Sequence, residues 1–497
     1  MAKIKGSPRS LLALIGFALS LALLASISAC TDNPNSALNH VLSVVKTGEP
    51  PLSPESRKEF NRFSDVYYRV STTPDNQERL DYFSFAFKRV RAAYVHPVSD
   101  AELIDAAIKG VQEREPAGSA IGSQLLVETA LHSMVASLDP HSSYMNPDEF
   151  RESFVQTKGE FGGLGIEVTM EDGLVKIVAP IEDTPAAKAG LLSGDLITSV
   201  DGEEIKGKTL SEAVRKMRGS PGSRIDLIIR RAGVDDFPVS LYRAVIKVRS
   251  VRWRTEGNIG YVRVTRFTEK VEDGIADAMH ALHKELGSNL KGIVLDLRNN
   301  PGGLLDQSLI LSDAFLNDGE IVSVRGRRAS SDRTYVASEG DLAEGLPMVV
   351  LINGGSASAS EIVASALKHH GRAMVMGAKS FGKGSVQTIM PLPVEGALRL
   401  TTALYYSPSG RTIQAHGVIP DIIIKEEQAV ERKAEVDLPG AIPAVSAALN
   451  QPHPIVPEKV CPPAGERQDR ILGCALALLG STSTSHFLAS YAQNSQM

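Results

Sequence analysis

Between about residues 260 and 390 the chain alternates short, fully apolar segments with amphipathic ones, and this alternation restricts the fold more than any other feature. Gly292–Leu297 and Met348–Ile352 are apolar almost from end to end, as strands buried on both faces are. Helical spacing of apolar residues follows in Leu304–Phe315 and Ser358–His370. Strands that alternate with helices predict a layered α/β domain whose central strands are mostly parallel. In such a domain, functional residues gather where strand ends meet helix starts.

Length and composition indicate that this domain belongs to a larger globular chain. The 497 residues suffice for about three domains, and 43% hydrophobic with 22% charged residues is ordinary for a folded protein. The net charge of −5 offers no basic surface, so we expect no nucleic-acid partner. HExxH, CxxC and EF-hand patterns are absent from the sequence, and we expect neither a metal nor a cofactor.

The amino terminus has the layout of an export signal. Three basic residues precede a largely apolar run, Leu11–Leu24. Ala29 and the small residues before it lead directly to Cys30, as in a bacterial lipobox, so Cys30 is expected to carry lipid. Plain cleavage after Ala29 and an uncleaved anchor are the alternatives. We therefore expect an exported, periplasmic protein that is anchored to the membrane as a lipoprotein.

Lipidation of Cys30 would leave two cysteines, Cys461 and Cys474, in an oxidising compartment. They lie close enough in sequence for a disulfide to close the loop between them, and two unrelated thiols are the alternative. Changes in composition divide the chain into six expected segments: a signal (1–29), a tether (30–75), a helical cap region (76–155), a domain of short strands (156–245), the α/β core (246–428) and a tail (429–497).

The domain of short strands carries motifs typical of peptide recognition. Pro185–Leu191 and Gly194–Ile197 match the PAxxAGL and GDxI segments of bacterial PDZ domains, so this part resembles a PDZ domain, a small partly open β-barrel. Successive N–H groups of a glycine-rich turn can bind a carboxylate, while the neighbouring strand edge pairs with an extended peptide. The expected peptide-binding residues are Gly163, Leu164, Gly165 and Ile166.

Three serines lie between a buried strand and a helix, in Asn353–Glu361: Ser356, Ser358 and Ser360. A serine at a helix amino terminus has unpaired N–H groups beside it. Acyl transfer needs such donors for the developing oxyanion. Helix capping by serine and glutamate is the alternative interpretation of this segment.

A nucleophilic serine needs a base. His369 and His370 end the same helix, about 15 Å from its start, and His416 lies in a polar turn without an evident acidic partner. Lys383 is flanked by glycines just before a strand, and burial would keep its amine neutral. In an extended segment Gln387 lies on the same face and can orient the amine.

A competing motif, Gly377–Lys383, fits the start of a phosphate-binding loop, GxxxxGK. Gly384 stands where a serine or threonine would bind magnesium, and a strand pattern follows instead of a helix. We therefore reject nucleotide binding.

Five segments in order resemble one known family, the carboxyl-terminal processing or tail-specific proteases, which are Ser/Lys peptidases with a PDZ domain. These segments are Leu138–Tyr144, Asp296–Gly303, Gly355–Ile362, Phe381–Gln387 and Arg411–Asp421. The resemblance implies an α/β multidomain fold with a helical amino-terminal cap, a PDZ domain and a layered, crotonase-like serine protease core.

The resemblance also implies roles for individual residues. Ser358 is the nucleophile, Lys383 the general base and later acid, and Gln387 the group that orients the amine. The oxyanion donors are the N–H of Ala359 and that of one glycine, Gly302 or Gly303.

The implied function is a serine endopeptidase whose protein substrates have exposed C-terminal tails. Arg218 lies in a stretch that the family uses near the hinge between the PDZ domain and the protease, or it is a solvated turn residue. An adaptor or activating peptide and a homo-oligomer are possible partners. A catalytically silent scaffold of the same fold and a hydrolase that uses His416 are the alternatives.

Overall fold

The computed structural model describes residues 52–73, 77–114, 121–181, 183–247, 249–427, 433–445, 452–465 and 468–494. The expected signal, Cys30 and most of the expected tether lie outside these ranges. The chain divides into two compact units, Met1–Arg57 and Lys58–Met497, and everything that follows on packing and on the site concerns the second. Within the described ranges, none of the helices has the length and apolar character that crossing a membrane would require.

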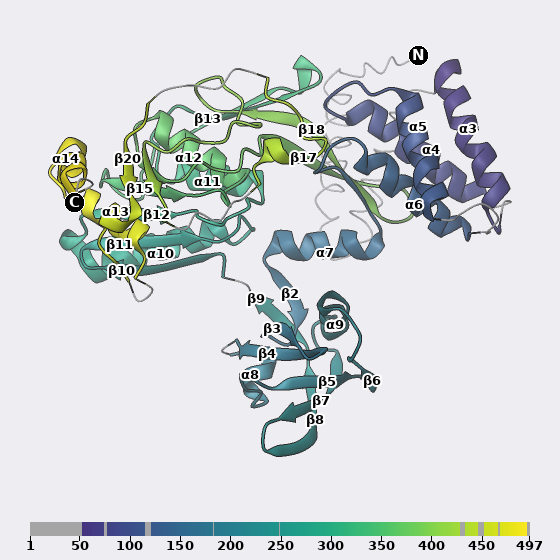
Figure 1. The fold of residues 1–497 in the computed structure, drawn as a ribbon, viewed down its shortest axis with the longest axis horizontal. Helices are drawn as coiled ribbons and strands as arrows, with labels where there is room; N and C mark the ends of the chain where they lie inside the picture. The colour runs from purple at the N-terminus through teal and green to yellow at the C-terminus, as the bar shows by residue number, and fades with distance from the viewer. Residues whose placement is uncertain are drawn as a thin grey trace, which may run out of the picture. The chain divides into compact units, whose positions relative to one another are not determined.

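Helices dominate the amino-terminal third of the described chain (Figure 1). Their bounds are α3 (Pro54–Val70), α4 (Gln77–Ala93), α5 (Asp100–Arg114), α6 (Ser123–Ala136) and α7 (Pro147–Lys158). Helix α3 corrects the expectation of a featureless tether up to residue 75. Its residues Phe63 and Tyr67 are fully buried, and the ring of Phe63 stacks on Phe83 of α4 with centroids 3.8 Å apart. Apolar residues four apart on one helical face, after a proline in the first turn, explain this helix.

A separate β-rich region follows, with its own apolar core. Its sheet has the order β3-β4-β5-β7-β8, and β6 pairs with β5, all antiparallel. A two-stranded ribbon of β2 and β9 connects it to the rest of the chain. The bounds are β2 (Glu160–Gly163), β3 (Ile166–Glu171), β4 (Leu174–Pro180), α8 (Pro185–Lys188), β5 (Leu196–Val200), β6 (Glu203–Glu204), α9 (Leu210–Met217), β7 (Arg224–Arg231), β8 (Val234–Tyr242) and β9 (Ala244–Lys247).

The predicted layered α/β domain is confirmed. Its seven-stranded sheet has the order β10-β11-β12-β15-β16-β19-β20, and every neighbouring pair except β10–β11 is parallel. The bounds are β10 (Val251–Glu256), β11 (Ile259–Val264), β12 (Gly292–Asp296), β15 (Met348–Ile352), β16 (Met374–Gly377), β19 (Ile422–Lys425) and β20 (Ile455–Pro457). A second, antiparallel sheet contains β1 (Ser143–Met145), β13 (Glu320–Gly326), β14 (Arg333–Val336), β17 (Ser385–Pro391) and β18 (Ala397–Tyr406).

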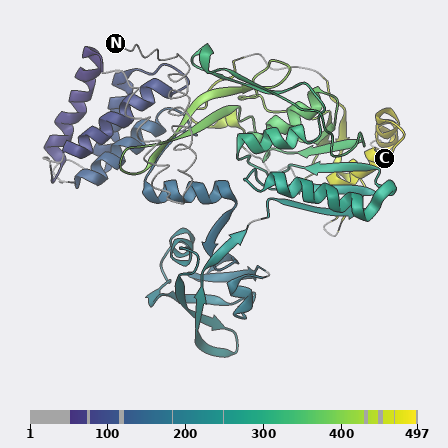
Figure 2. The ribbon, with the colours of Figure 1, turned by 180° about the vertical axis from the view of Figure 1, so that it is seen from behind.

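Successive side chains of the central strands point to opposite faces, and each face has its own apolar core. On one face lie α10 (Val271–Leu286), α11 (Leu305–Asp313) and α12 (Ala359–His369) (Figure 2). Their apolar residues share a core with Leu295 and Val350 of the strands. On the other, α13 (Arg470–Leu479) and α14 (Thr484–Asn494) contribute to a core that contains Val294 and Leu351.

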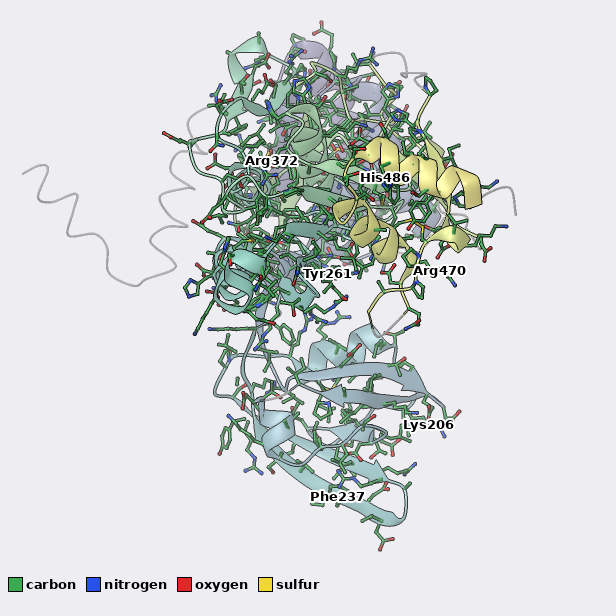
Figure 3. All side chains as sticks on the ribbon, turned by 90° about the vertical axis from the view of Figure 1, so that its left-hand side faces the viewer. Lys206, Phe237, Tyr261, Arg372, Arg470 and His486 are labelled. Carbon is green, nitrogen blue, oxygen red and sulfur yellow. A yellow bond between two sulfur atoms is a disulfide. The ribbon has the colours of Figure 1, made fainter. Side chains whose placement is uncertain are left out.

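The segment after residue 429, expected to be a separate tail, is therefore part of the α/β core in its described portions. Strand β20 extends the sheet beside β19, and Cys474 of α13 and Phe487 of α14 are completely buried. Figure 3 shows both helices, with Arg470 at the start of α13 and His486 on α14. The strands β12 and β15 are apolar on both faces, so each face must be covered by apolar side chains. The segment after residue 429 covers the second face.

Candidate active site

The expected nucleophile lies at a strained turn between β15 and α12. Ser358 is the residue that precedes α12, and it has a φ of +55° and a ψ of −113°. A side chain in this region costs about 1–3 kcal/mol and persists only where surrounding contacts impose it. The carbonyl of Ser358 accepts hydrogen bonds from the N–H groups of Glu361 and Ile362, at 2.8 and 3.0 Å, which hold the turn.

The three serines of this segment differ in their hydrogen bonds. The hydroxyl of Ser356 donates to the carbonyl of Leu297 at 2.8 Å, and that of Ser360 donates to the carbonyl of Asn300 at 2.9 Å. Both serines are completely buried, whereas Ser358 is 9% exposed. The Ser358 hydroxyl donates to no group in the described part of the chain. Two serines thus fasten the turn to the loop after β12, and the third has a hydroxyl that can react.

A buried carboxyl group joins the serine segment to the lysine segment. Oε2 of Glu361 accepts the N–H groups of Ser358 at 2.7 Å and Lys383 at 2.9 Å. Oε1 accepts the Ser380 hydroxyl at 2.6 Å and the Gly382 N–H at 2.7 Å. Burial raises the pKa of Glu361 to about 7, against the lowering effect of these four donors. The backbone N–H groups of the two expected dyad residues thus donate to the same oxygen atom.

Lys383 lies just before β17 in a segment that requires glycine. A side chain at Gly384 would meet the backbone nitrogen of Gln414 at 2.1 Å, so only glycine permits this approach. Burial lowers the pKa of Lys383, and the cation of Arg399 acts in the same direction, while the carboxylate of Glu435 opposes both. Within the described residues, the Nζ of Lys383 makes no hydrogen bond or ion pair. Burial therefore favours the neutral form of this amine.

The amide group of Gln387 is held by a chain of hydrogen-bonded polar groups. Its amide nitrogen donates to the hydroxyls of Ser385 at 3.0 Å and Thr401 at 3.2 Å. The Thr401 hydroxyl donates in turn to Asp139 at 3.1 Å, and the same carboxylate accepts the hydroxyl of Ser142 at 2.6 Å. The Leu138–Tyr144 motif is thus hydrogen-bonded to β18, the strand that pairs with β17. The amide nitrogen of Gln387 is engaged by two hydroxyl groups, and its oxygen is left as the atom that can accept a hydrogen bond.

A second buried network lies beside the first. Glu435, completely buried, accepts from Nε2 of His141 at 2.8 Å and from the amide of Gln414 at 2.9 Å. The amide oxygen of Gln414 accepts the N–H of Gly384 at 2.9 Å. Glu435 lies in the segment first expected to be a separate tail, so that segment also fixes the residues around Lys383.

The loop after β12 approaches the nucleophile closely. A side chain at Gly302 would lie 2.8 Å from the Cβ of Ser358, and the N–H of Gly302 donates to the side chain of Asn300 at 2.9 Å. Asn300 also donates to the carbonyl of Val264 at 2.9 Å. No described group accepts the N–H of Gly303 or of Ala359. Of the two glycines expected to bind the oxyanion, Gly302 already uses its N–H in a hydrogen bond to Asn300.

The PDZ candidates lie around β2 and β3. Gly163 ends β2, Gly165 has a φ of +77°, Ile166 begins β3, and Leu164 is 2% exposed in the core of this region. These positions form one turn between β2 and β3, and β3 is the edge strand of its sheet.

Arg218 directly follows α9, and it is not a freely solvated turn residue. It pairs with Glu152 of α7, and its guanidinium lies over the ring of Phe161 of β2, 4.4 Å from the centroid. Arg218 thus connects three elements: α7, α9 and the ribbon that leads into the PDZ region.

His369, His370 and His416 were the alternative candidates for the base. His370 donates from Nε2 to the carbonyl of Glu320 at 2.7 Å. His369 and His416 line a cavity of about 270 Å³ that Ser358, Lys383 and Gln387 do not line. Among the described residues, histidine, cysteine and acidic side chains form no group that could hold a metal ion.

Several residues of the site could not be identified from the sequence. Glu361 was visible as a capping-box glutamate, although its contacts with the lysine segment were not. Asp139 and His141 were visible only as part of a motif. Nothing in the sequence indicates Thr401 or Glu435, because their partners are distant along the chain.

Comparison with known proteins identifies the family of this chain. Residues 258–424 match peptidase family S41, and residues 176–231 match the PDZ domain. The carboxy-terminal-processing protease of Bartonella bacilliformis is 51% identical over 362 residues, which cover 72% of this chain and 78% of that protein. The carboxy-terminal processing protease CtpA of Bacillus subtilis is 33% identical over 347 residues, 69% of this chain and 68% of that protein.

Among solved structures, the photosystem II D1 C-terminal processing protease is 27% identical, with 70% of this chain and 92% of that chain covered and a TM-score of 0.44. The sequence relatives define a class: a serine-type peptidase that carries a PDZ domain. Within that class, the chain belongs to the carboxy-terminal-processing proteases of peptidase family S41.

Proposed function

We propose that this protein is a serine endopeptidase that binds the free C-terminus of a substrate and cleaves it with a Ser358/Lys383 dyad. The observation that carries the proposal is the pairing of two unusual groups. Ser358 has a hydroxyl that donates to no described residue at a strained helix start. The backbone N–H groups of Ser358 and Lys383 both donate to Oε2 of Glu361. Burial lowers the pKa of the Lys383 amine.

The reaction uses Lys383 first as a base and then as an acid. Its neutral amine takes the hydroxyl proton while the Ser358 oxygen attacks the substrate carbonyl carbon, whose electron pair moves to the carbonyl oxygen. When the tetrahedral intermediate collapses, the C–N bond breaks and Lys383 gives the proton to the leaving amine. Water then attacks the acyl group in the same way and regenerates Ser358. The amide oxygen of Gln387 accepts from the lysine amine and orients it.

The oxyanion is stabilised by the N–H groups of Ala359 and Gly303. Neither donates to a described group, whereas the N–H of Gly302 is bonded to Asn300, which favours Gly303 of the two glycines. Ala359 is the first residue of α12, where the helix macrodipole also favours negative charge.

Substrate recognition falls to the PDZ domain. The turn from Gly163 to Ile166 binds the terminal carboxylate, and β3 pairs with the extended tail. Arg218, through its contacts with Glu152 and Phe161, transmits the position of the PDZ domain to α7 and from there to the protease core.

The protein acts outside the cytoplasm, held to a membrane by lipid on Cys30. The disulfide between Cys461 and Cys474 supports an oxidising compartment. Incorporation of a labelled fatty acid tests the anchor: Cys30→Ala should abolish labelling, and unchanged labelling would refute it.

Two variants test the dyad. Ser358→Ala and Lys383→Ala should each abolish cleavage of a protein with an unfolded apolar tail, without lowering the melting temperature or the affinity for a C-terminal peptide. Residual turnover in either variant would show that the dyad is wrong. A wild-type protein that binds such tails and cuts none would instead be a scaffold.

A further inference from the structure

Arg298, the second residue after β12, has its guanidinium between two carboxylates. Its Nε and Nη2 donate to Asp296 at 3.0 and 2.6 Å, and its Nη1 and Nη2 donate to Asp469 at 3.1 and 2.6 Å. Asp296 is in the same segment, whereas Asp469 lies 171 residues further along the chain. Asp469 also lies beyond residues 258–424, the part that matches the peptidase family.

The charges of this cluster balance. Asp296 is completely buried and also accepts from Arg263 at 3.2 Å and from the Tyr261 hydroxyl at 2.7 Å. Two arginines and two aspartates therefore share the site. Without Asp469, two guanidinium groups would share one carboxylate, and the side chain of Arg298 is only 10% exposed to water. Loss of the Asp469 charge would leave the cluster with one uncompensated positive charge and the Nη1 of Arg298 without its carboxylate, which disfavours the present position of Arg298.

Arg298 begins the loop that reaches the nucleophile. The next two residues attach this loop to the serine turn: the N–H of Asn299 donates to the side chain of Asn353 at 2.9 Å, and the carbonyl of Asn300 accepts the N–H of Ala357 at 3.0 Å. Gly303, the proposed oxyanion donor, ends the same loop. A displacement of Arg298 is thus passed to the groups that would bind the oxyanion.

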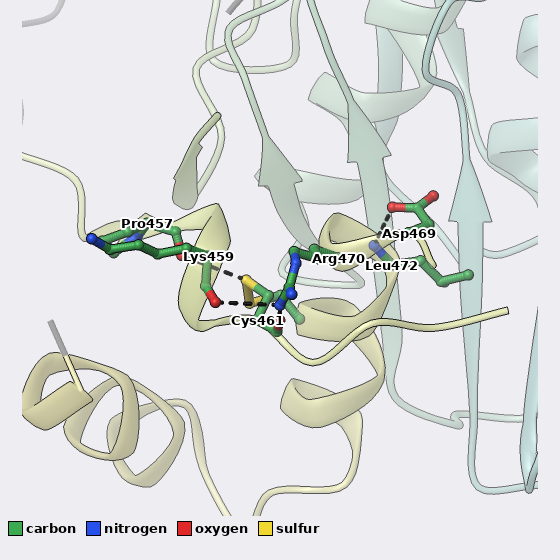
Figure 4. Close-up of a disulfide and its surroundings, with 7 residues drawn as sticks. Pro457, Lys459, Cys461, Asp469, Arg470 and Leu472 are labelled. Atoms are coloured by element: carbon green, nitrogen blue, oxygen red, sulfur yellow. Dashed lines mark hydrogen bonds between the residues drawn. A yellow bond between two sulfur atoms is a disulfide. The ribbon is translucent and has the colours of Figure 1, made fainter. Parts of the chain in front are cut away.

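Asp469 is itself held firmly. Its carboxylate accepts the N–H of Leu472 at 3.0 Å and caps α13, and its backbone exchanges two hydrogen bonds with Ala464. The disulfide between Cys461 and Cys474 encloses this turn. Figure 4 shows Asp469 beside Leu472, and the guanidinium of Arg470 directed at the carbonyl of Cys461, 2.6 Å away. The tail therefore presents one fixed carboxylate to Arg298.

We propose that Asp469 is a positioning residue for catalysis, which holds the oxyanion-binding loop in place through Arg298. The inference rests on the proposed function, since it assumes that this loop stabilises the oxyanion. It gives the C-terminal segment an indirect part in the reaction, in addition to its part in covering the sheet.

The test compares Asp469→Asn with wild type. Asparagine caps a helix as well as aspartate does, so α13 is preserved while the charge on Arg298 is lost. An oxyanion contact acts in the transition state, so kcat should fall by about ten-fold with KM unchanged. The affinity for a peptide boronic acid, which forms a tetrahedral adduct on the serine, should fall by a similar factor. Binding of a C-terminal peptide should be unchanged.

Three controls make the result specific. Asp469→Ser, which also keeps the cap, should behave like Asp469→Asn. Glu458→Gln removes a tail carboxylate whose described hydrogen bond is to the N–H of Glu427, and it should leave kcat unchanged. In an Arg298→Met background, Asp469→Asn should have no further effect on boronic acid affinity, because the two residues act as one unit.

The proposal is overturned if Asp469→Asn keeps the wild-type kcat, if it raises only KM, or if its effect persists in the Arg298→Met background. An equal fall in kcat and in the fraction of titratable, folded enzyme would also overturn it. None of these outcomes would affect the dyad, which Ser358→Ala and Lys383→Ala test separately.

Discussion

At the scale of single residues, Glu361 does more than cap a helix. Each of its two oxygens accepts two hydrogen bonds, and the four donors come from the serine turn and from the lysine segment. A carboxyl group can accept on both oxygens, whereas an amide can accept on only one. The requirement is therefore for this functional group and not only for a side chain of this size.

Glu361→Gln should accordingly lower kcat by about 10²-fold, because its NH₂ group would face two donors and displace either the serine or the lysine. Steady-state kinetics on a tailed substrate measure this effect. Glu149→Gln is a matched control, since Glu149 occupies the capping box of α7, where it is solvent-exposed, and should leave kcat unchanged. A Glu361→Gln enzyme with normal kcat would show that the carboxyl is merely structural.

The pH dependence of the reaction should show the titration of the Lys383 amine. Burial lowers its pKa below the ordinary 10.5, and only the neutral amine is a base. The value of kcat/KM should therefore rise with pH and level off above this lowered pKa. Arg399 contributes to the lowering, so Arg399→Met should shift the rise to higher pH. Rates measured from about pH 6 to about pH 10 test this.

Arg325→Met is the control, since this guanidinium stacks on Tyr406 and is not among the charges that act on Lys383. A profile that Arg399→Met leaves in place would contradict the assignment. The stability effect has the corresponding sign. A lysine with a lowered pKa favours the folded state above its ordinary pKa, and this contribution is lost as pH falls through the lowered value.

At the scale of elements, the disulfide closes a short loop at the start of α13. The double variant Cys461→Ser/Cys474→Ser should lower the free energy of unfolding by about 3 kcal/mol, mainly because the unfolded chain gains freedom. Denaturant titration measures the loss. Wild-type protein kept in dithiothreitol should match the variant, and equal stability of the oxidised protein and the variant would refute the prediction.

At the scale of the whole molecule, the central sheet is stable only with both faces covered. A chain that ends at Glu427 would lose β20, α13 and α14, and it would expose a row of buried side chains: Tyr261, Val294, Val349, Leu351 and Met376. Each buried apolar side chain contributes about 1.5–3 kcal/mol, and the sum is comparable to the entire stability of a domain.

This truncation should therefore abolish cooperative unfolding and cause aggregation, which calorimetry and size-exclusion chromatography detect. A chain that ends at Gly480 keeps α13 and loses only α14, and it should still fold. A monomeric Glu427 truncation with a wild-type melting temperature would show that the tail is not part of the core.

Elements with a strong local signal could be predicted from the sequence. The strands β12 and β15 and the helix α12 follow from uninterrupted or periodic apolar residues. Helix α3 was not predicted, because its polar residues masked the apolar face that contains Phe63 and Tyr67. Helix α7 was not predicted either, although Asn146 and Glu149 form a capping box at its start. Weak amphipathic patterns become helices only where a partner surface exists.

The sequence by itself determined the order of strands and helices, the PDZ motifs and the short segments that contain Ser358, Lys383 and Gln387. These depend on residues near one another in the chain. Only the tertiary structure decided which of three serines has a hydroxyl that donates to no described group, that Gly302 is already bonded, and that the tail completes the core. Such distinctions depend on hydrogen bonds across 60 residues, from Ser360 to Asn300, and across 171, from Arg298 to Asp469, and no local pattern encodes them.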